Sequence, residues 1–362
     1  MTAKKVTWLE LFYDLLFVAA VSKASHVLLH VEDETLSPQT LGKFVLIFIP
    51  IWWAWVGQTL FVNRYGQDII SHRIFLIIQL FFVLIMTASL SLDFDQTYYS
   101  FLIGYVGLRA MTAVQYLFVR TKENGHLRAT AHYLGTRFWV GLVISACSLF
   151  FDSWVRYLVL YAGIALDILL PLLGRKILVK TPANTHHLLE RFSLFALILL
   201  GESVVSILAV LQSSVWTLQS VGFAALTFVL IIAMWWQYYD NLEKKVDKNV
   251  HTAGQTIIYG HLFIFLSLCI LAASIQLLFL NTLHYELMLN LIFGSVLLYF
   301  ASTTMVFHVY RHKQHQLGIV HLGVLTAILV CFYILDVVVH VSNVMIMGEL
   351  ALFFAVYAKI TT

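Results

Sequence analysis

The chain has 362 residues, of which 60% are hydrophobic and only 11% are charged, and its mean hydropathy is +0.86. Soluble domains are about 45–50% apolar and about 25% charged, so this composition excludes a water-soluble globular protein and a disordered one. The net charge of +3 is small and gives no indication of nucleic-acid binding. We therefore expect one polytopic membrane domain surrounded by membrane lipids.

Twelve stretches are each long and apolar enough to cross a bilayer, which takes about 20 mostly apolar residues. In chain order they lie near 9–30, 42–62, 74–92, 98–119, 132–151, 155–173, 188–211, 218–240, 256–280, 286–308, 317–339 and 343–360. Glu10 and Asp14 interrupt the first stretch, so we interpret it as a retained span rather than a signal peptide. The sequence thus predicts an all-α bundle of about 12 transmembrane helices.

Lysine and arginine gather in alternate connections between these stretches, and such residues favour the cytoplasmic side. With the N-terminus inside, the inside segments hold Lys4, Lys5, Arg64, Arg73, Arg120, Lys122, Arg128, Arg175, Lys176, Lys180, Lys244, Lys245, Lys248, Arg311, Lys313 and Lys359. The outside segments hold Lys43 and Arg156, with the acidic runs "HVEDET" and "SLDFDQ". We expect a multi-pass protein of the cell (plasma or inner) membrane with both termini in the cytoplasm.

The two halves of the chain resemble each other at a nearly constant offset. "LELFYDLLFVAAVS" from Leu9 aligns with "LERFSLFALILLGESVVS" from Leu189, and the pair Trp52-Trp53 aligns with Trp235-Trp236. We predict two parallel six-helix repeats, residues 1–180 and 181–362, related by an axis along the membrane normal. The interface of such repeats often forms a transport path.

The first span carries Glu10 and Asp14 four residues apart, hence on one helix face. They either satisfy backbone N–H groups and nearby arginines at the helix N-terminus or serve a functional role. The span is polar at both ends and apolar across residues 15–21, which is typical both of a pore-lining helix with a hydrophobic constriction and of an ordinary span.

Several ionisable residues are predicted to lie deep in the membrane. Glu202 in "LLGESVV" and Arg109 in "YVGLRAM" lie near the middle of their spans, where a charge costs at least about 2.5–3.5 kcal/mol unless it is paired or hydrated. Asp167 and Arg137 are a further buried acid and base. Such residues form either structural pairs, for example Glu202 with Arg109, or a relay for an ion.

A polar cluster is predicted at the cytoplasmic mouth. Its members are Gln237, Tyr238 and Asp240 of "WWQYYDN", His261 of "YGHLF", and Glu190 with Arg191. A histidine among carboxylates is compatible with a divalent metal, but no H-x-x-x-H or C-x-x-C spacing supports one, so we expect no cofactor. His186-His187 are interpreted as solvated loop residues. An aromatic belt at the span ends is expected from Trp52, Trp53, Trp55, Trp139, Trp154, Trp216, Trp235 and Trp236.

The chain resembles the bacterial low temperature requirement A (LtrA) family. The resemblance lies in "WLELFYDLLFVAAVS", "WWAWVGQTLFVNRYGQD", "HHLLERFSLFALILLGESVVSIL", "WWQYYDN" and "IIYGHLFIF", which cover most of the chain in order. It implies an integral membrane protein without assigning a biochemical activity, since the family name refers to growth in the cold.

A second, fainter resemblance concerns the opening of the first span. "FYDLLFVAAV" is similar to the Phe-Ser-Asp stretch that opens the first helix of the endosomal-lysosomal and bacterial potassium channels built from six-helix repeats. The resemblance implies that Phe12, Tyr13 and Asp14 belong to a pore-lining helix. The chain departs from that pattern in having Trp8 in place of the arginine that begins it, Tyr13 in place of serine, and Leu194 opposite Asp14 in the second half.

Our leading hypothesis is a channel or transporter for an ion or small solute. Glu202 and Arg109 would lie in its core, and Glu10, Asp14, Glu190, Arg191, Asp240 and His261 would shape its cytoplasmic side. The alternatives are an intramembrane enzyme acting on lipid and a non-transporting component needed at low temperature. Familiar catalytic motifs such as G-x-S-x-G are absent, so the enzyme hypothesis is weaker than the transport hypothesis. The oligomeric state, a homo-oligomer included, is left open.

Overall fold

The computed structural model describes residues 6–91, 93–213, 215–312 and 315–361, and over these residues its secondary-structure elements are all helices, joined by loops. Its helices are α1 (Trp8–His26), α2 (Pro38–Tyr65), α3 (Ile70–Ala88), α4 (Phe94–Arg120), α5 (Gly125–Cys147), α6 (Ser153–Leu173), α7 (Arg175–Leu178), α8 (Thr185–Ser213), α9 (Leu218–Lys244), α10 (Gln255–Leu280), α11 (Tyr285–Tyr310), α12 (Ile319–Val339) and α13 (Asn343–Thr361). Two short 3-10 helices follow α1 and α5, at Val27–Leu29 and Ser148–Phe150.

Twelve of these helices are long and apolar enough to cross a membrane, and the four-residue α7 is not among them. The predicted polytopic all-α fold is therefore confirmed. Lys4, Lys5 and Lys313, which contribute to the predicted orientation, lie outside the described residues. The cytoplasmic placement of the termini and the duplication at residue 180 stay predictions.

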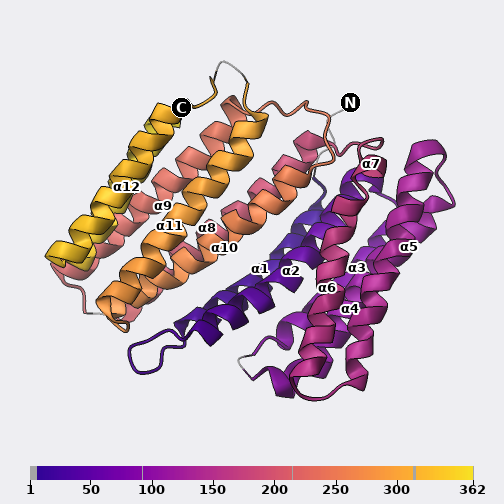
Figure 1. Ribbon diagram of the computed structural model, residues 1–362, viewed down its shortest axis with the longest axis horizontal. Coiled ribbons are helices and arrows are strands. Elements are labelled where there is room, and N and C mark those ends of the chain that lie inside the picture. The colour runs from indigo at the N-terminus through magenta and orange to yellow at the C-terminus, as the bar shows by residue number, and fades with distance from the viewer. Residues whose placement is uncertain (1–5, 92, 214, 313–314, 362) are drawn as a thin grey trace. The chain divides into compact units, whose positions relative to one another are not determined.

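The chain divides into two compact units, with boundaries that fall inside α1, α2 and α8 (Figure 1). The first comprises Met1–Ala24, Leu46–Arg191 and His251–Gln255, and the second comprises Ser25–Val45, Phe192–Val250 and Thr256–Thr362. In the first unit α3 packs on α4, α4 on α5 and α5 on α6, and in the second α9 packs along α13 while α12 contacts α11 and α13.

Small residues bring α5 and α6 of the first unit close together. A Cβ atom on Gly141 would lie 2.8 Å from the carbonyl oxygen of Gly163, and one on Gly163 would lie 2.5 Å from that of Gly141. Neither contact is tolerable, so both positions require glycine. Close backbone approach at small residues is a common way to associate helices in lipid, where apolar side chains gain little by leaving the bilayer.

Proline within α2 leaves a backbone acceptor that the fold satisfies. Pro50 has no N–H and cannot donate to the carbonyl of Leu46, four residues earlier. The hydroxyl of Tyr161 in α6 donates to that oxygen at 2.9 Å instead. The contact ties α2 to α6 within the first unit, because a carbonyl without a partner is costly in an apolar medium.

The tryptophans of α2 do not form an aromatic belt. Trp52, Trp53 and Trp55 are at most 1% exposed and lie in the middle of the helix, so the expectation that they lie at a span end is wrong for these three. For two of them the reason is that buried carboxylates need N–H donors: Trp53 donates to Asp167 and Trp55 donates to Asp14. Trp154, Trp216 and Trp236 are exposed, as residues of a belt would be.

Candidate functional site

Two acids of α1 are held by one arginine of α8 in the first unit. The Nη1 atom of Arg191 lies 2.6 Å from Oε2 of Glu10, and its Nη2 atom lies 2.6 Å from Oδ1 of Asp14. Trp55 donates to the same Asp14 oxygen at 2.7 Å, and Nε2 of His187 lies 3.2 Å from Oε2 of Glu10. We call these five residues the Arg191 cluster; each of the four ionisable side chains is at most 3% exposed.

The local sequence explains why Glu10 occupies this position. Thr7 and Glu10 form a capping box at the start of α1: the hydroxyl of Thr7 accepts from the backbone N–H of Glu10, while Oε1 of Glu10 accepts from the backbone N–H and hydroxyl of Thr7. Both carboxylate oxygens of Glu10 are thus engaged, one in the cap and one with Arg191 and His187. This geometry favours the interpretation in which Glu10 is a charge-paired acid at the helix start.

A second buried pair joins α4 and α6 in the same unit. Nε and Nη2 of Arg109 both lie 2.7 Å from Oδ2 of Asp167, which also accepts from Trp53 at 2.9 Å. The guanidinium carbon lies 4.6 Å from the ring centroid of Phe138, at cation–π distance. The counter-charge of Arg109 is therefore Asp167, whereas the sequence offered Glu202 as the example of a partner for Arg109.

Glycine makes room for this arginine. A Cβ atom on Gly57 of α2 would lie 1.9 Å from Nη1 of Arg109. Arg109 is completely buried and bound to Asp167, so it has little freedom to move away. Sequence reasoning did not single out Gly57, because nothing in its neighbours indicates what packs against it.

Glu202 lies in the second unit, where it lines a cavity of about 190 Å³. The other polar lining residues are Ser25, His26, Ser206 and Gln276, and alanines 209, 272 and 273 form much of the apolar wall. Glu202 and Ser206 are one helical turn apart in α8, and the Ser206 hydroxyl donates to the carbonyl of Ala272 at 2.7 Å. We call this cavity the Glu202 pocket. Glu202 itself is buried, with 8% of its surface exposed.

Of the residues predicted at the cytoplasmic mouth, Tyr238 and His261 contact each other, while Asp240 pairs with a residue outside the predicted cluster. Asp240 forms an ion pair with Lys244, one turn further along α9. Nδ1 of His261 lies 2.7 Å from the carbonyl oxygen of Ile257 and therefore donates to it, so Nε2 accepts from the hydroxyl of Tyr238 at 2.8 Å. Glu190 is half-buried in α8. Among the described residues no group of three or more His, Cys, Asp or Glu side chains is placed to hold a metal ion.

Arg137 of α5 is exposed, so within the described residues no other helix covers it. The interpretation of His187 is wrong. His187 is completely buried rather than solvated, since α8 begins at Thr185 and places His187 one turn before Arg191. The four-residue spacing of His187 and Arg191 could have indicated that both lie on one face of a helix. In the structure the side-chain amide nitrogen of Asn63 lies 3.2 Å from Nδ1 of His187.

These observations define a polytopic helical membrane protein with two kinds of buried acid, one paired with arginine and one at a cavity. The family described as "Bacterial low temperature requirement A protein (LtrA)" matches residues 5–357, so the chain belongs to this family. An uncharacterized protein of Rhizobium meliloti (strain 1021) is similar, with 27% identity over 272 residues. The match covers 71% of this chain and 66% of the relative, slightly less than two thirds of the relative's length.

Proposed function

We propose that the protein transports a small cation, a proton or an alkali metal ion, across the cell membrane and that Glu202 binds it. The observation that carries this proposal is the cavity that reaches Glu202. A carboxylate in hydrocarbon is tolerated only where it is paired or faces a polar cavity, and such residues commonly mark ion pathways.

The chemistry of the Glu202 pocket supports a cation over an anion. Its lining contains one carboxylate, two hydroxyls, an amide and an imidazole, and it contains no lysine or arginine. A volume of about 190 Å³ corresponds to about six water molecules at about 30 Å³ each, so the occupant is small. Oxygen ligands of this kind suit hard cations and proton transfer.

The position along the helices supports a path toward the side predicted to be outside. Gln276 lies in the last two turns of α10, and Ser25 and His26 end α1. By the predicted orientation these ends face away from the cytoplasm. The pocket would therefore give Glu202 access to outside ions, with His26 at its exposed rim.

Flux measurements test the proposal. Purified protein in liposomes is given a gradient of H⁺, Na⁺ or K⁺, and the flux is followed with a pH- or ion-sensitive dye. We expect wild-type flux above that of empty liposomes for at least one cation and a loss of about tenfold or more in Glu202→Gln, the change produced by about 1.4 kcal/mol in the barrier.

The matched control is Glu286→Gln. Glu286 is an exposed acid in the first turn of α11 and does not line the pocket, so its removal should leave the flux unchanged. Wild-type flux equal to that of empty liposomes for all three cations would contradict the proposal and favour a non-transporting membrane component. Equal flux in wild type and Glu202→Gln would show that Glu202 does not bind the ion.

A further inference from the structure

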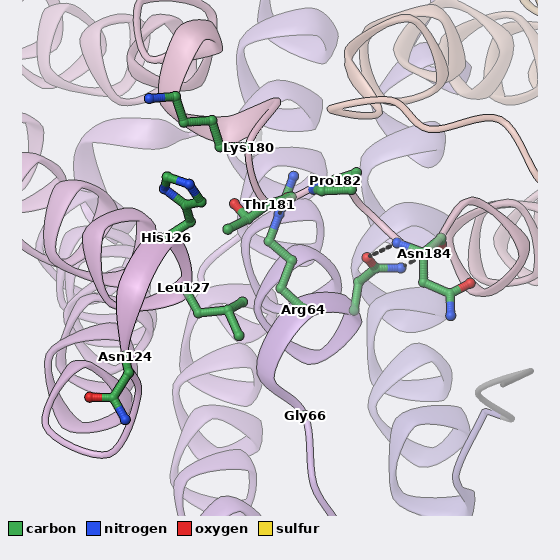
Figure 2. Close-up of a pocket in the computed structure, with 10 residues that line it drawn as sticks. Arg64, Gly66, Asn124, His126, Leu127, Lys180, Thr181, Pro182 and Asn184 are labelled. Carbon is green, nitrogen blue, oxygen red and sulfur yellow. Dashed lines mark hydrogen bonds between the residues drawn. The ribbon is translucent and has the colours of Figure 1, made fainter. Parts of the chain in front are cut away.

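The first unit contains a larger cavity, of about 730 Å³, that the proposed transport path does not use (Figure 2). It lies around the end of α2, the start of α5 and the segment between α7 and α8. Its charged and strongly polar lining residues are Asn63, Arg64, Asn124, His126, Lys180 and Asn184, and its lining includes no aspartate or glutamate. We call it the Arg64 pocket.

Arg64 brings a positive charge to this pocket without a carboxylate to balance it. Its Nε atom donates to the carbonyl of Thr181 and its Nη2 atom donates to that of Ala253, each at 3.2 Å. Carbonyl oxygens orient a guanidinium but leave its net charge in place, and within the described ranges Arg64 forms no ion pair. In Figure 2 its side chain reaches up toward Thr181 with His126 and Lys180 to one side and Asn184 to the other.

The start of α5 adds a second source of positive potential. Asn124 is the N-cap residue, but its side chain makes no capping hydrogen bond, and His126 and Leu127 of the first turn line the pocket. Uncapped N–H groups at the start of a long helix attract anions. The hydroxyl of Tyr65, beside Arg64, donates to the carbonyl of Leu127 at 2.9 Å and fixes this turn against α2.

Lys180 and the asparagines complete the arrangement. Lys180 is exposed and follows α7, so its ammonium group can approach an occupant from the rim. Asn63 and Asn184 are joined by two hydrogen bonds of 2.9 Å, one between the Asn63 side-chain oxygen and the Asn184 backbone N–H and one between the Asn63 amide and the Asn184 carbonyl. This pairing joins the end of α2 to the segment before α8 at one wall of the pocket.

We propose that the Arg64 pocket binds a phosphate group on the membrane face that the charge pattern assigns to the cytoplasm. A planar guanidinium, an ammonium and helix N–H groups are the donors that recognise phosphate oxygens. The group comes either from free phosphate or from the headgroup of an anionic lipid, since basic pockets at the ends of transmembrane helices bind such headgroups.

Two binding measurements distinguish the sources. In the first, full-length protein in phosphatidylcholine nanodiscs is titrated with inorganic phosphate by calorimetry. In the second, detergent-solubilised protein is incubated with phosphatidic acid and the bound lipid is counted by native mass spectrometry. Each is repeated with Lys180→Ala, with Arg64→Gln, and with Lys176→Ala as the control, because Lys176 is an exposed α7 lysine outside the pocket.

We expect at least one probe to bind, with Lys180→Ala weakening binding by about tenfold, the order of one charge-assisted hydrogen bond, and Lys176→Ala changing it by less than about twofold. Binding of phosphate alone identifies a soluble ligand, and binding of phosphatidic acid alone identifies a lipid headgroup. The proposal is overturned if neither probe binds at about 10 mM, or if Lys176→Ala weakens binding as much as Lys180→Ala does. Because Lys180 is exposed, this comparison stands even if Arg64→Gln does not fold.

Discussion

The Arg191 cluster and the Glu202 pocket place the same chemical group, a buried carboxylate, in opposite surroundings. Glu10 and Asp14 each accept from Arg191 at 2.6 Å and are further bound by His187, Thr7 or Trp55. Glu202 lies instead at the wall of a cavity with hydroxyl, amide and imidazole neighbours. We therefore expect the surroundings of each acid, rather than the number of acids in the spans, to separate acids that hold helices together from the one proposed to bind an ion.

The difference has an energetic basis. Removing one partner of a buried ion pair leaves an uncompensated charge and costs about 3–5 kcal/mol. An acid at the wall of a polar cavity has room for water beside it and can lose its charge at a smaller cost to the fold. Substitutions at the two kinds of acid should therefore separate stability from transport.

The largest effect is expected for Arg191→Met. This change removes the base shared by Glu10 and Asp14 and leaves two buried carboxylates opposed only by His187, so we expect destabilisation by about 3–5 kcal/mol and loss of folded protein from the membrane. Thermal melting in detergent, followed by size-exclusion chromatography, measures it. A melting temperature equal to that of wild type would show that the Arg191 cluster contributes nothing to stability.

The next effect concerns Arg109 and Asp167. Arg109→Gln should cost about 3 kcal/mol, because Asp167 is left charged and the hydrogen bond from Trp53 does not neutralise it. Combining it with Asp167→Asn removes the stranded charge and should recover more than half of the loss. The four proteins form a double-mutant cycle, and additive losses would contradict direct pairing.

A smaller loss is expected for Gly57→Ala. The added methyl group would overlap Nη1 of Arg109, and forcing such a contact in a packed interior costs about 1–3 kcal/mol. Gly201→Ala is the control, since a Cβ atom there has no neighbour within 4 Å. Equal melting temperatures for the two variants would mean that Arg109 moves aside freely.

The smallest effect on stability is expected at an arginine–aspartate pair that, unlike those of the Arg191 cluster, is exposed. Arg73 donates to both oxygens of Asp68 at 2.7 and 2.8 Å, yet both side chains are more than half exposed. The hydrogen bonds from Arg73 lower the pKa of Asp68 below its ordinary value. A lowered pKa stabilises the folded state above the unfolded pKa, and the effect is lost as the pH falls through the folded pKa.

Water screens this exposed pair, so Asp68→Asn should leave the melting temperature unchanged near neutral pH. Thermal melting of wild type and Asp68→Asn between pH 7 and about pH 3 checks this expectation. A clear loss at pH 7 would contradict the view that burial, rather than pair geometry, makes the Arg191 cluster stabilising.

Much of the fold was accessible from the sequence. Hydropathy alone predicts twelve spans, because a backbone segment in lipid must satisfy its own hydrogen bonds and a long apolar stretch does so as a helix. The described structure has twelve such helices. The helix ends were less accessible: α5 begins at Gly125 rather than near residue 132, since the polar stretch "GHLRAT" continues the helix beyond the apolar run.

The candidate site was accessible only in part. Glu10, Asp14 and Arg191 were singled out by charge, and the structure brings these three together. Their partners Trp55 and His187 come from positions that a hydropathy pattern assigns to a belt and a loop, so the pattern could not reveal them. Arg109 and Asp167 lie on different helices, so no spacing in the sequence indicates that they form an ion pair.

The most direct test of the central claim compares flux and stability in Glu202→Gln. We expect this variant to keep a melting temperature within about 2–4 °C of wild type, equivalent to about 1 kcal/mol or less, while its cation flux in liposomes falls by about tenfold or more. Wild-type flux with unchanged stability, or a collapse of folding comparable to Arg191→Met, would contradict this expectation.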